Sequence, residues 1–144
     1  LPSGPPEVGP LAPNTSLAAL DPAFRAKVER LEPELVRVLA LSGITMRRGE
    51  TLRGWARQTY LYGIGRAYQA AGRTGTVTNA IAATGNHPKG KAVDYNYYKG
   101  GVYLGSGDEA KNAIAPHAAR MEAAFGVKWG GFWTKPDVPH WEDA

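Results

Sequence analysis

The apolar residues of this sequence occur in short runs that glycine and proline interrupt. The longest uninterrupted aliphatic stretches, such as residues 38–41, span four residues, whereas a helix that crosses a bilayer needs roughly 20. We therefore expect no membrane insertion. The chain has 144 residues, of which 43% are hydrophobic, 18 are glycine and 11 are proline, so it is too apolar to be disordered and too irregular for a coiled coil. One folded domain with many loops is the expected result.

The prolines divide the chain into two parts. Five of them lie in residues 1–20, where Glu7 is the one ionisable side chain. Because this segment has no apolar periodicity, we expect a proline-rich tail or linker at residues 1–20 and the folded domain at residues 21–144. The sequence does not begin with a charged region followed by an apolar one, so export would use a route other than a signal peptide, or a segment that precedes residue 1.

The spacing of apolar positions, three and four residues apart, predicts α-helices in three places. The predicted helices span residues 22–43, 54–71 and 109–125. Asp21 is the expected N-cap of the first helix, and Asp108 is that of the third. Pro33 lacks a backbone donor and predicts a kink or a break in the first helix, and Pro116 could split the third.

The second predicted helix has a mixed inner side. We expect Trp55, Gln58 and Tyr62 to face the interior, with Leu61 as a further candidate, and Gly72 to end the helix. The polar residues that follow, 73–86, are expected to form a loop.

An alternating segment predicts a central strand. In residues 91–98, Asp94 and Asn96 fall on one face and Val93 and Tyr95 on the other, as in a strand that packs on one side. Further short strands are predicted at residues 44–46, 127–129 and 139–142. Helices and strands together predict an α+β fold, in which a small antiparallel sheet is flanked by helices.

The absence of cysteine limits the chemistry that this chain can perform. Disulfides, thiolate metal sites and cysteine nucleophiles are excluded, so a metal would need histidine or carboxylate ligands. A catalytic zinc site has three such ligands and an open position, and His87, Asp94 and His140 would make that set. From spacing alone, however, a histidine near an aspartate is more often a surface or hydrogen-bonded residue.

Other polar residues near these candidates have both a functional and a structural interpretation. Asp137 could take a proton from the attacking water and pass it to a leaving amine, or it could form the turn before Pro139. Glu142 could orient the His140 imidazole, or it could be a solvated edge residue. His117 has no acidic partner at ligand spacing and is expected to be a surface or packing residue.

Four motifs in order along the chain carry a resemblance to a known family. His-x-x-Gly-x-Ala-x-Asp spans residues 87–94, and Asp-x-Pro-His-Trp-Glu spans 137–142. Arg-x4-Gln-x2-Leu-Tyr-x2-Gly-Arg spans 53–66, and Trp-Gly-Gly-x-Trp spans 129–133. Together they resemble the zinc peptidases of the D-alanyl-D-alanine carboxypeptidase and L-alanyl-D-glutamate endopeptidase family, over about residues 31–142.

The resemblance implies a role for each of five residues. One zinc ion per chain would be bound by His87, Asp94 and His140, so the α+β fold would be built around a zinc site. Asp137 would be the catalytic carboxylate, and Arg53 would polarise the scissile carbonyl and stabilise its oxyanion.

Two positions depart from the family pattern. The family usually has serine two residues before the first histidine, where this chain has Gly85, and serine or threonine after the arginine, where it has Gly54. Each change removes a hydroxyl: the first puts in doubt a hydrogen bond near the zinc, and the second could loosen the placement of Arg53.

The leading interpretation is a zinc metallopeptidase that hydrolyses the L-alanyl-D-glutamate bond of peptidoglycan stem peptides and acts as a monomer. Asp137 and the turn at residues 129–133 resemble the endopeptidase branch found in phage lysins. The alternatives are a D-alanyl-D-alanine carboxypeptidase and an inactive, zinc-stabilised wall-binding module. We expect action at the bacterial cell wall or periplasm, with delivery by a holin, a phage particle or a secretion system.

The net charge of +4 and the isoelectric point near 9.4 favour an anionic partner, such as nucleic acid, anionic lipid or a wall polymer. Neither long helix carries a stripe of lysine and arginine, and no recognition motif has the spacing of a nucleic-acid-binding domain. We therefore expect peptidoglycan, and not nucleic acid, to be the partner.

Overall fold

The computed structural model describes residues 1–70, 73, 75–78, 80–81 and 85–144. The α-helices in this part are α1 (Pro22–Ala40), α2 (Trp55–Gly63) and α3 (Asp108–Phe125). The strands are β1 (Ile44–Arg48), β2 (Ala92–Lys99), β3 (Val102–Tyr103), β4 (Val127–Trp129) and β5 (His140–Asp143). Short 3-10 helices span Gly9–Leu11 (η1), Leu17–Ala19 (η2), His87–Lys89 (η3) and Gly130–Phe132 (η4). The predicted α+β class is confirmed.

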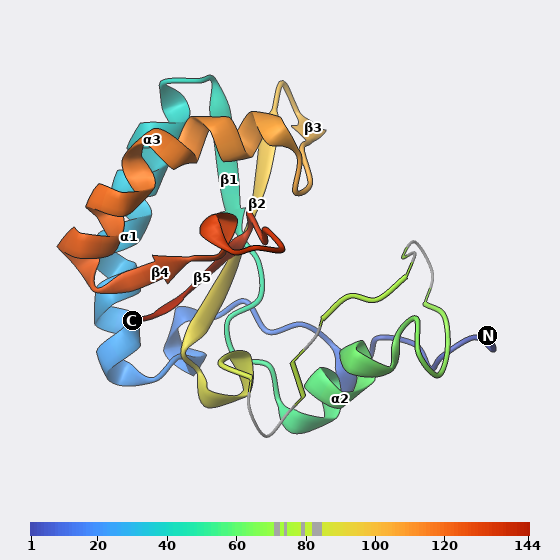
Figure 1. The fold of residues 1–144 in the computed structure, drawn as a ribbon. Helices are drawn as coiled ribbons and strands as arrows, with labels where there is room; N and C mark the ends of the chain where they lie inside the picture. The colour runs from blue at the N-terminus through green and yellow to red at the C-terminus, as the bar shows by residue number, and fades with distance from the viewer. Residues whose placement is uncertain (71–72, 74, 79, 82–84) are drawn as a thin grey trace.

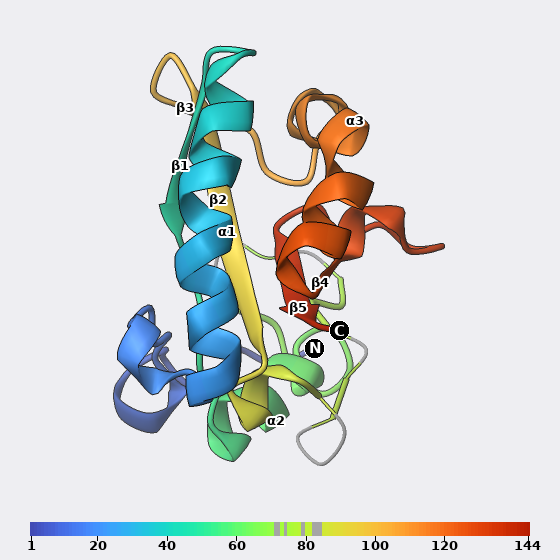
Figure 2. The same cartoon turned by 90° about the vertical axis from the view of Figure 1, so that its left-hand side faces the viewer.

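The strands form one antiparallel sheet in the order β1-β2-β5-β4, and β3 pairs with β2. Helices α1 and α3 lie side by side against this sheet (Figures 1 and 2). Helix α2 and the N-terminal segment lie beyond the end at which β2 begins (Figure 1). As the alternation predicted, Val93 and Tyr95 are fully buried in the core, whereas Asp94 is on the other face. The register places Asp94 directly opposite His140.

Helix α1 continues through Pro33, so the predicted break does not occur. A proline inside a helix costs roughly 3 kcal/mol, while the burial of each large apolar side chain contributes about 1.5–3 kcal/mol. Leu31 and Leu35, on either side of the proline, are fully buried in the same core, and this burial outweighs the lost backbone bond. Helix α3 likewise continues through Pro116.

The N-caps are predicted correctly at one helix and misplaced by one residue at another. The Asp21 side chain accepts a hydrogen bond of 3.2 Å from the Phe24 backbone and caps α1. The N-cap of α3 is Gly107, and Asp108 lies in the first turn. There its charge still faces the positive end of the helix dipole.

Helix α2 ends at Gly63 and is therefore shorter than the predicted helix, which extended to residue 71. Gly65 adopts a φ of +80°, which L side chains rarely adopt, and reverses the chain. Tyr68 then folds back, stacks on Tyr60 at 5.5 Å between ring centroids, and donates a 2.7 Å hydrogen bond to its carbonyl. Trp55, predicted to face inward, is 64% exposed. Gly72 and part of the predicted loop 73–86 lie outside the described residues.

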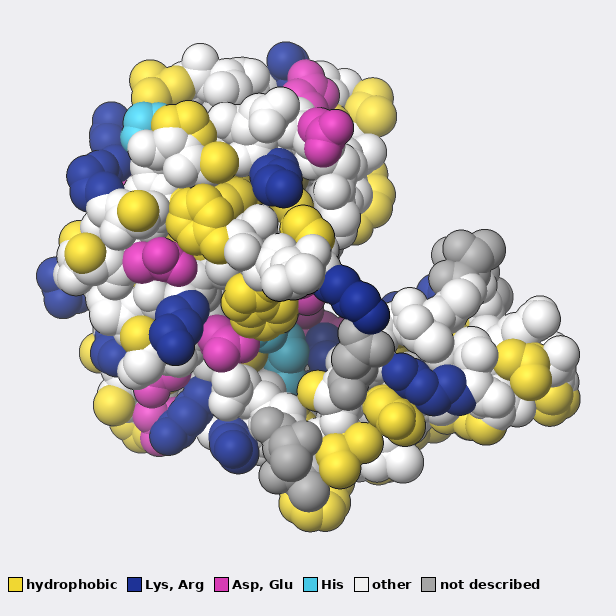
Figure 3. All heavy atoms as spheres, viewed as in Figure 1, with side chains coloured by type: hydrophobic (Ala, Val, Ile, Leu, Met, Phe, Trp, Pro, Cys, Tyr) yellow, Lys and Arg dark blue, Asp and Glu magenta, His cyan; other side chains and the backbone are white. Residues whose placement is uncertain are grey.

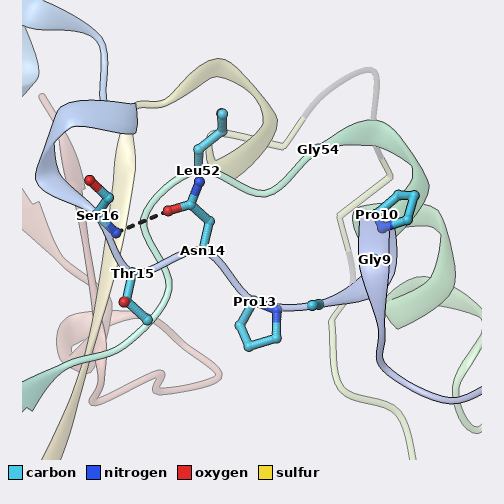
Figure 4. Close-up of a pocket in the computed structure, with 9 residues that line it drawn as sticks. Gly9, Pro10, Pro13, Asn14, Thr15, Ser16, Leu52 and Gly54 are labelled. Atoms are coloured by element: carbon cyan, nitrogen blue, oxygen red, sulfur yellow. Dashed lines mark hydrogen bonds between the residues drawn. The ribbon is translucent and has the colours of Figure 1, made fainter.

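The N-terminal segment runs beside α2 and the chain that precedes it. Gly4 and Gln69 are joined by a backbone hydrogen bond of 2.7 Å. The Thr51 hydroxyl donates to the carbonyls of Asn14 and Ser16, at 3.1 and 2.8 Å. Residues 9–10 and 12–16 line a cavity of about 570 Å³ together with Leu52 and Gly54 (Figure 4). A domain boundary at residue 21 stays a prediction.

None of the described helices combines the length and the apolar character that a membrane span needs.

Candidate metal centre and cleft

Three side chains from three elements meet beside the paired strands β2 and β5. His87 belongs to η3, Asp94 to β2 and His140 to β5. Asp94 Oδ1 lies 3.3 Å from His87 Nε2 and 3.2 Å from His140 Nδ1. The three ligand atoms lie within 4.8 Å of one another, so the group could hold a metal ion.

The hydrogen bonds of both imidazoles leave a lone pair directed at this centre. His87 Nδ1 lies 3.0 Å from the Thr51 carbonyl oxygen, which can only accept, so Nδ1 carries the proton and Nε2 is free to coordinate. His140 Nε2 lies 2.7 Å from a Glu142 carboxylate oxygen, so Nε2 donates and Nδ1 can coordinate. Metal-binding histidines are commonly held by such an outer hydrogen bond. Glu142 therefore has the orienting position that the sequence suggested.

The polar atoms at this centre fit a metal ion. His87 Nε2 and Asp94 Oδ1 are buried and have no hydrogen-bond partner among the described residues. An unsatisfied buried polar atom costs about 1–3 kcal/mol, and a cation between the two would remove that cost. Two imidazoles and a carboxylate without any thiolate match a catalytic zinc site better than a structural one.

Without an ion, a proton on His140 compensates the buried charge of Asp94. Burial alone would raise the pKa of Asp94, but its contacts with His87 and His140 hold that pKa well below its usual range. Burial alone would lower the pKa of His140, but contacts with Asp94 and Glu142 raise it to about 9. A metal that binds here must therefore displace a proton from His140.

A tight turn brings His87 beside the strand that carries Asp94. Gly90 ends η3 with a φ of +70°, and its backbone N–H donates to the His87 carbonyl at 3.1 Å. Its own carbonyl accepts a 3.0 Å hydrogen bond from the Asp21 backbone N–H. A Cβ at this position would lie 2.9 Å from that nitrogen, so both conformation and space require glycine.

Asp137 lies in the connection between β4 and β5, close to His140. The Gly130 carbonyl accepts from the Asp137 backbone N–H at 2.9 Å, and the Asp137 carbonyl accepts from the His140 N–H at 3.2 Å. A Cβ on Gly130 would lie 2.5 Å from the Asp137 carbonyl oxygen, so glycine permits this fold of the chain. Burial raises the pKa of Asp137, and the charge of Asp94 adds to the rise. A carboxyl group with a raised pKa suits proton transfer.

Arg53 approaches the centre from the α2 side and is 8% exposed. Its Nε donates to Glu50 at 2.9 Å, Nη1 to Gln58 at 3.0 Å, and Nη2 to Asp94 Oδ2 at 3.3 Å. Each terminal nitrogen has a second N–H, for which no described residue is a hydrogen-bond partner. Burial alone would raise the pKa of Glu50, but Arg57 and Arg53 outweigh it and lower that pKa, so Glu50 is an anion at neutral pH.

These groups line one cleft of about 1010 Å³. Figure 3 shows it as a hollow with histidine side chains at its base. On the α2 side it is lined by Leu61 and Val77, and on the other side by Tyr103, Trp133 and Lys135. The Trp133 ring lies 4.9 Å from the His140 ring and so covers one side of a candidate ligand.

The structure brings together all five site residues predicted from the sequence, because His87, Asp94, His140, Asp137 and Arg53 line this one cleft. His117 lies on α3 and does not line the cleft. Sequence reasoning missed the supporting groups, which are Glu50, Arg57 and the Thr51 carbonyl. Glu50 and Arg57 could have been recognised from their spacing of three and four residues from Arg53, which places opposite charges close together.

Comparisons with known proteins agree with this site. The family model for D-alanyl-D-alanine carboxypeptidase matches residues 78–143, a span that contains His87, Asp94, Asp137 and His140. Among solved structures, the chain is similar to the L-Ala D-Glu endopeptidase ChiX of Serratia marcescens, with 28% identity and a TM-score of 0.51. That similarity covers 82% of this chain and 86% of the other. No curated protein sequence matches. The family resemblance of the sequence is confirmed.

Proposed function

We propose that this chain, a peptidase of the D-alanyl-D-alanine carboxypeptidase and L-alanyl-D-glutamate endopeptidase family, hydrolyses the L-alanyl-D-glutamate bond of peptidoglycan stem peptides. The observation that carries the proposal is the meeting of a metal-ligand group with Asp137 and Arg53 at the base of one open cleft. The action would take place at the bacterial cell wall or periplasm.

His87, Asp94 and His140 would hold one zinc ion, with Nε2, Oδ1 and Nδ1 as the ligand atoms. Two imidazoles and one carboxylate are a ligand set that zinc accepts. When bound, zinc activates water and polarises a carbonyl as a Lewis acid. The outer hydrogen bonds to the Thr51 carbonyl and to Glu142 keep both imidazoles oriented.

Asp137 would be the general base and then the general acid. Its carboxylate would take a proton from the attacking water as the new carbon–oxygen bond forms. It would return that proton to the amine of D-glutamate as the carbon–nitrogen bond breaks. The raised pKa of Asp137 brings its proton affinity closer to neutral pH, where such transfers are efficient.

Arg53 would bind the carbonyl oxygen on which negative charge develops. The guanidinium is almost buried, and electrostatic interactions are stronger in such a site than in water. A fixed donor of this kind commonly contributes about 100-fold or more to the rate.

The shape of the cleft favours cleavage within a peptide over the removal of one terminal residue. A carboxypeptidase needs a closed pocket that captures a carboxylate, whereas this cleft extends from the candidate ligands toward Val77 on one side and toward Tyr103 and Lys135 on the other. Structural similarity to an L-Ala D-Glu endopeptidase favours the same bond. The second candidate, a D-alanyl-D-alanine carboxypeptidase, rests on the description of the family model.

Mass spectrometry of muropeptides after digestion of purified sacculi tests the proposal. We expect stem peptides that begin with D-glutamate, and L-alanine that stays on muramic acid. The Asp137→Asn variant is the control, because it should keep the metal and lose hydrolysis. Release of single D-alanine residues would select the carboxypeptidase, and sacculus binding without new products would select an inactive wall-binding module.

A further inference from the structure

The structure assigns Glu50 as a positioning residue for Arg53. Glu50 is three residues before Arg53, and its carboxylate accepts a hydrogen bond from Arg53 Nε, which leaves the two terminal nitrogens of the guanidinium for other partners. This inference rests on the proposed peptidase function and adds to it the residue that fixes the oxyanion-binding group.

The Glu50 carboxylate is held by two arginines at once. Its Oε2 accepts from Arg53 Nε at 2.9 Å and from Arg57 Nε at 2.9 Å, while its Oε1 accepts from Arg57 Nη2 at 2.5 Å. The pair with Arg57 is therefore bidentate, which fixes direction as well as distance. The Arg57 side chain is only 2% exposed, so water does not compete strongly for these bonds.

Arg57 is itself fixed by a third segment. It lies in the first turns of α2 and also donates to the Leu11 carbonyl and to Glu7. The Glu50 backbone carbonyl accepts a 2.8 Å hydrogen bond from the Asp94 N–H. Glu50 is thus tied both to the N-terminal segment and to the strand that carries a candidate metal ligand.

The charge of Glu50 also determines where Arg53 rests. Arg53 is attracted by Asp94, and its contact with Asp94 Oδ2 is 3.3 Å, longer than its 2.9 Å bond to Glu50. Without the Glu50 charge, the attraction of Asp94 would be opposed by the neutral Gln58 oxygen, which accepts from Arg53 Nη1 at 3.0 Å, and the guanidinium would shift toward Asp94. The free N–H groups would then leave the position at which the carbonyl oxygen develops charge, and a displacement of about 1 Å costs substantial rate.

The Glu50→Gln variant tests this inference on the zinc-loaded full chain with a stem peptide. We expect kcat to fall by about tenfold to a hundredfold, with KM changed less than about twofold, because the loss acts mainly in the transition state. Glu32→Gln is the matched control. Glu32 forms a bidentate pair with Arg48 at 2.6 and 2.7 Å and does not line the cleft, so its kcat should stay at the wild-type value.

A double-mutant cycle separates positioning from a structural effect. In an Arg53→Ala background, Glu50→Gln should change kcat by less than about twofold, since the group that it positions is absent. A phosphinic peptide with L-alanine and D-glutamate side chains gives a readout apart from turnover. Its affinity should fall with kcat in Glu50→Gln, while zinc content stays unchanged.

The outcomes distinguish this inference from the proposed function. If the wild-type protein cleaves the stem peptide but Glu50→Gln keeps its kcat, or loses the same factor with and without Arg53, the positioning role is wrong and the function stands. If the wild-type protein cleaves no stem peptide, the proposed function is wrong. Should Glu50→Gln melt below the assay temperature, Glu50→Asp replaces it, because the shorter side chain withdraws the carboxylate from Arg53 Nε. We then expect kcat to fall as well, and an unchanged kcat would contradict the positioning role.

Discussion

The two sides of the cleft are stabilised by different forces. On the sheet side, α1, α3 and the strands share one apolar core, which includes the fully buried Leu35 and Trp141. Among the described residues, the separate apolar cluster on the α2 side has three buried members, Tyr60, Leu61 and Ile64. Much of the rest of that side is held by ion pairs and hydrogen bonds, with Arg57 and Glu50 at their centre.

Because of this difference, the residues of the site are held in place with different strength. Asp94 and His140 are paired across two strands of the sheet side, so their spacing is set by the larger core. Arg53 and Gln58 come from the α2 side, where fewer apolar contacts oppose local opening. Regions with few buried apolar contacts open at lower free energy. Asp94 and His140 should therefore stay in place under conditions in which Arg53 moves. The third candidate ligand, His87, is hydrogen-bonded to the Thr51 carbonyl and to the Arg53 backbone N–H, so it should move with the α2 side.

The largest expected effect is on the sheet side, at the candidate metal centre. His140→Ala removes one of three candidate ligands, so we expect loss of bound zinc and a fall in hydrolysis of more than about 1000-fold. His117→Ala is the matched control, because His117 is half-buried on α3 and away from the cleft. Elemental analysis and turnover are the measurements. Wild-type protein without stoichiometric metal after zinc is supplied would contradict the metal assignment.

The same leucine-to-alanine substitution should affect the whole fold on the sheet side but only the local structure on the α2 side. Leu35 and Leu61 are both fully buried, and replacing either with alanine costs about 2–5 kcal/mol of local packing. We expect Leu35→Ala to lower the global free energy of unfolding by that amount, as measured by urea denaturation. Leu61→Ala should instead speed amide exchange in α2 and leave β2 protected. Equal loss of protection in both elements would show that the two sides unfold as one unit.

The pH dependence of zinc binding should report the proton at His140. Without metal its pKa is raised to about 9, so the protonated imidazole stabilises the metal-free fold below about pH 6.5 and that contribution is lost as the pH rises through 9. Since zinc needs the neutral ring, its apparent affinity should rise by up to about tenfold per pH unit toward pH 9 and then level. Competition titrations with a chelator at fixed ionic strength measure this slope. A flat profile between pH 7 and 9 would contradict the raised pKa.

The same division explains which features the sequence could predict. The elements of the sheet side have periodic apolar residues, so α1, α3 and the alternation in β2 can be predicted from the sequence. The candidate ligands were predicted mainly from the family resemblance, because spacing alone left a hydrogen-bonded role open. The structure places Asp94 on the polar face of β2 and Gly90 in the turn that returns His87 to it.

The α2 side could not be predicted in the same way, because its contacts are not local. The end of α2 depends on Tyr68 folding back onto Tyr60, and helical spacing alone cannot show this. The N-terminal segment has no apolar pattern, yet its backbone carbonyls accept hydrogen bonds from Thr51 and Arg57. Every residue has a backbone carbonyl, so hydrogen bonds to these groups produce no pattern in the sequence.

The smallest expected effect is a stabilisation of the α2 side by the substitution Gly54→Ser. This residue is the N-cap of α2, with a φ of −60° and a ψ of 164°, and a Cβ there would meet nothing within 4 Å. A Gly54→Ser hydroxyl can accept a hydrogen bond from the first turn, and serine also lowers the entropy of the unfolded chain. Together these effects should add about 0.5–1 kcal/mol, seen as slower amide exchange in α2 and a melting temperature higher by about 2–4 °C. Gly100→Ser is the matched control, because that site is equally open but has a φ of +55°, so serine there should destabilise the fold. If Gly54→Ser gave no protection in α2, the missing cap would not be what limits the stability of this side of the cleft.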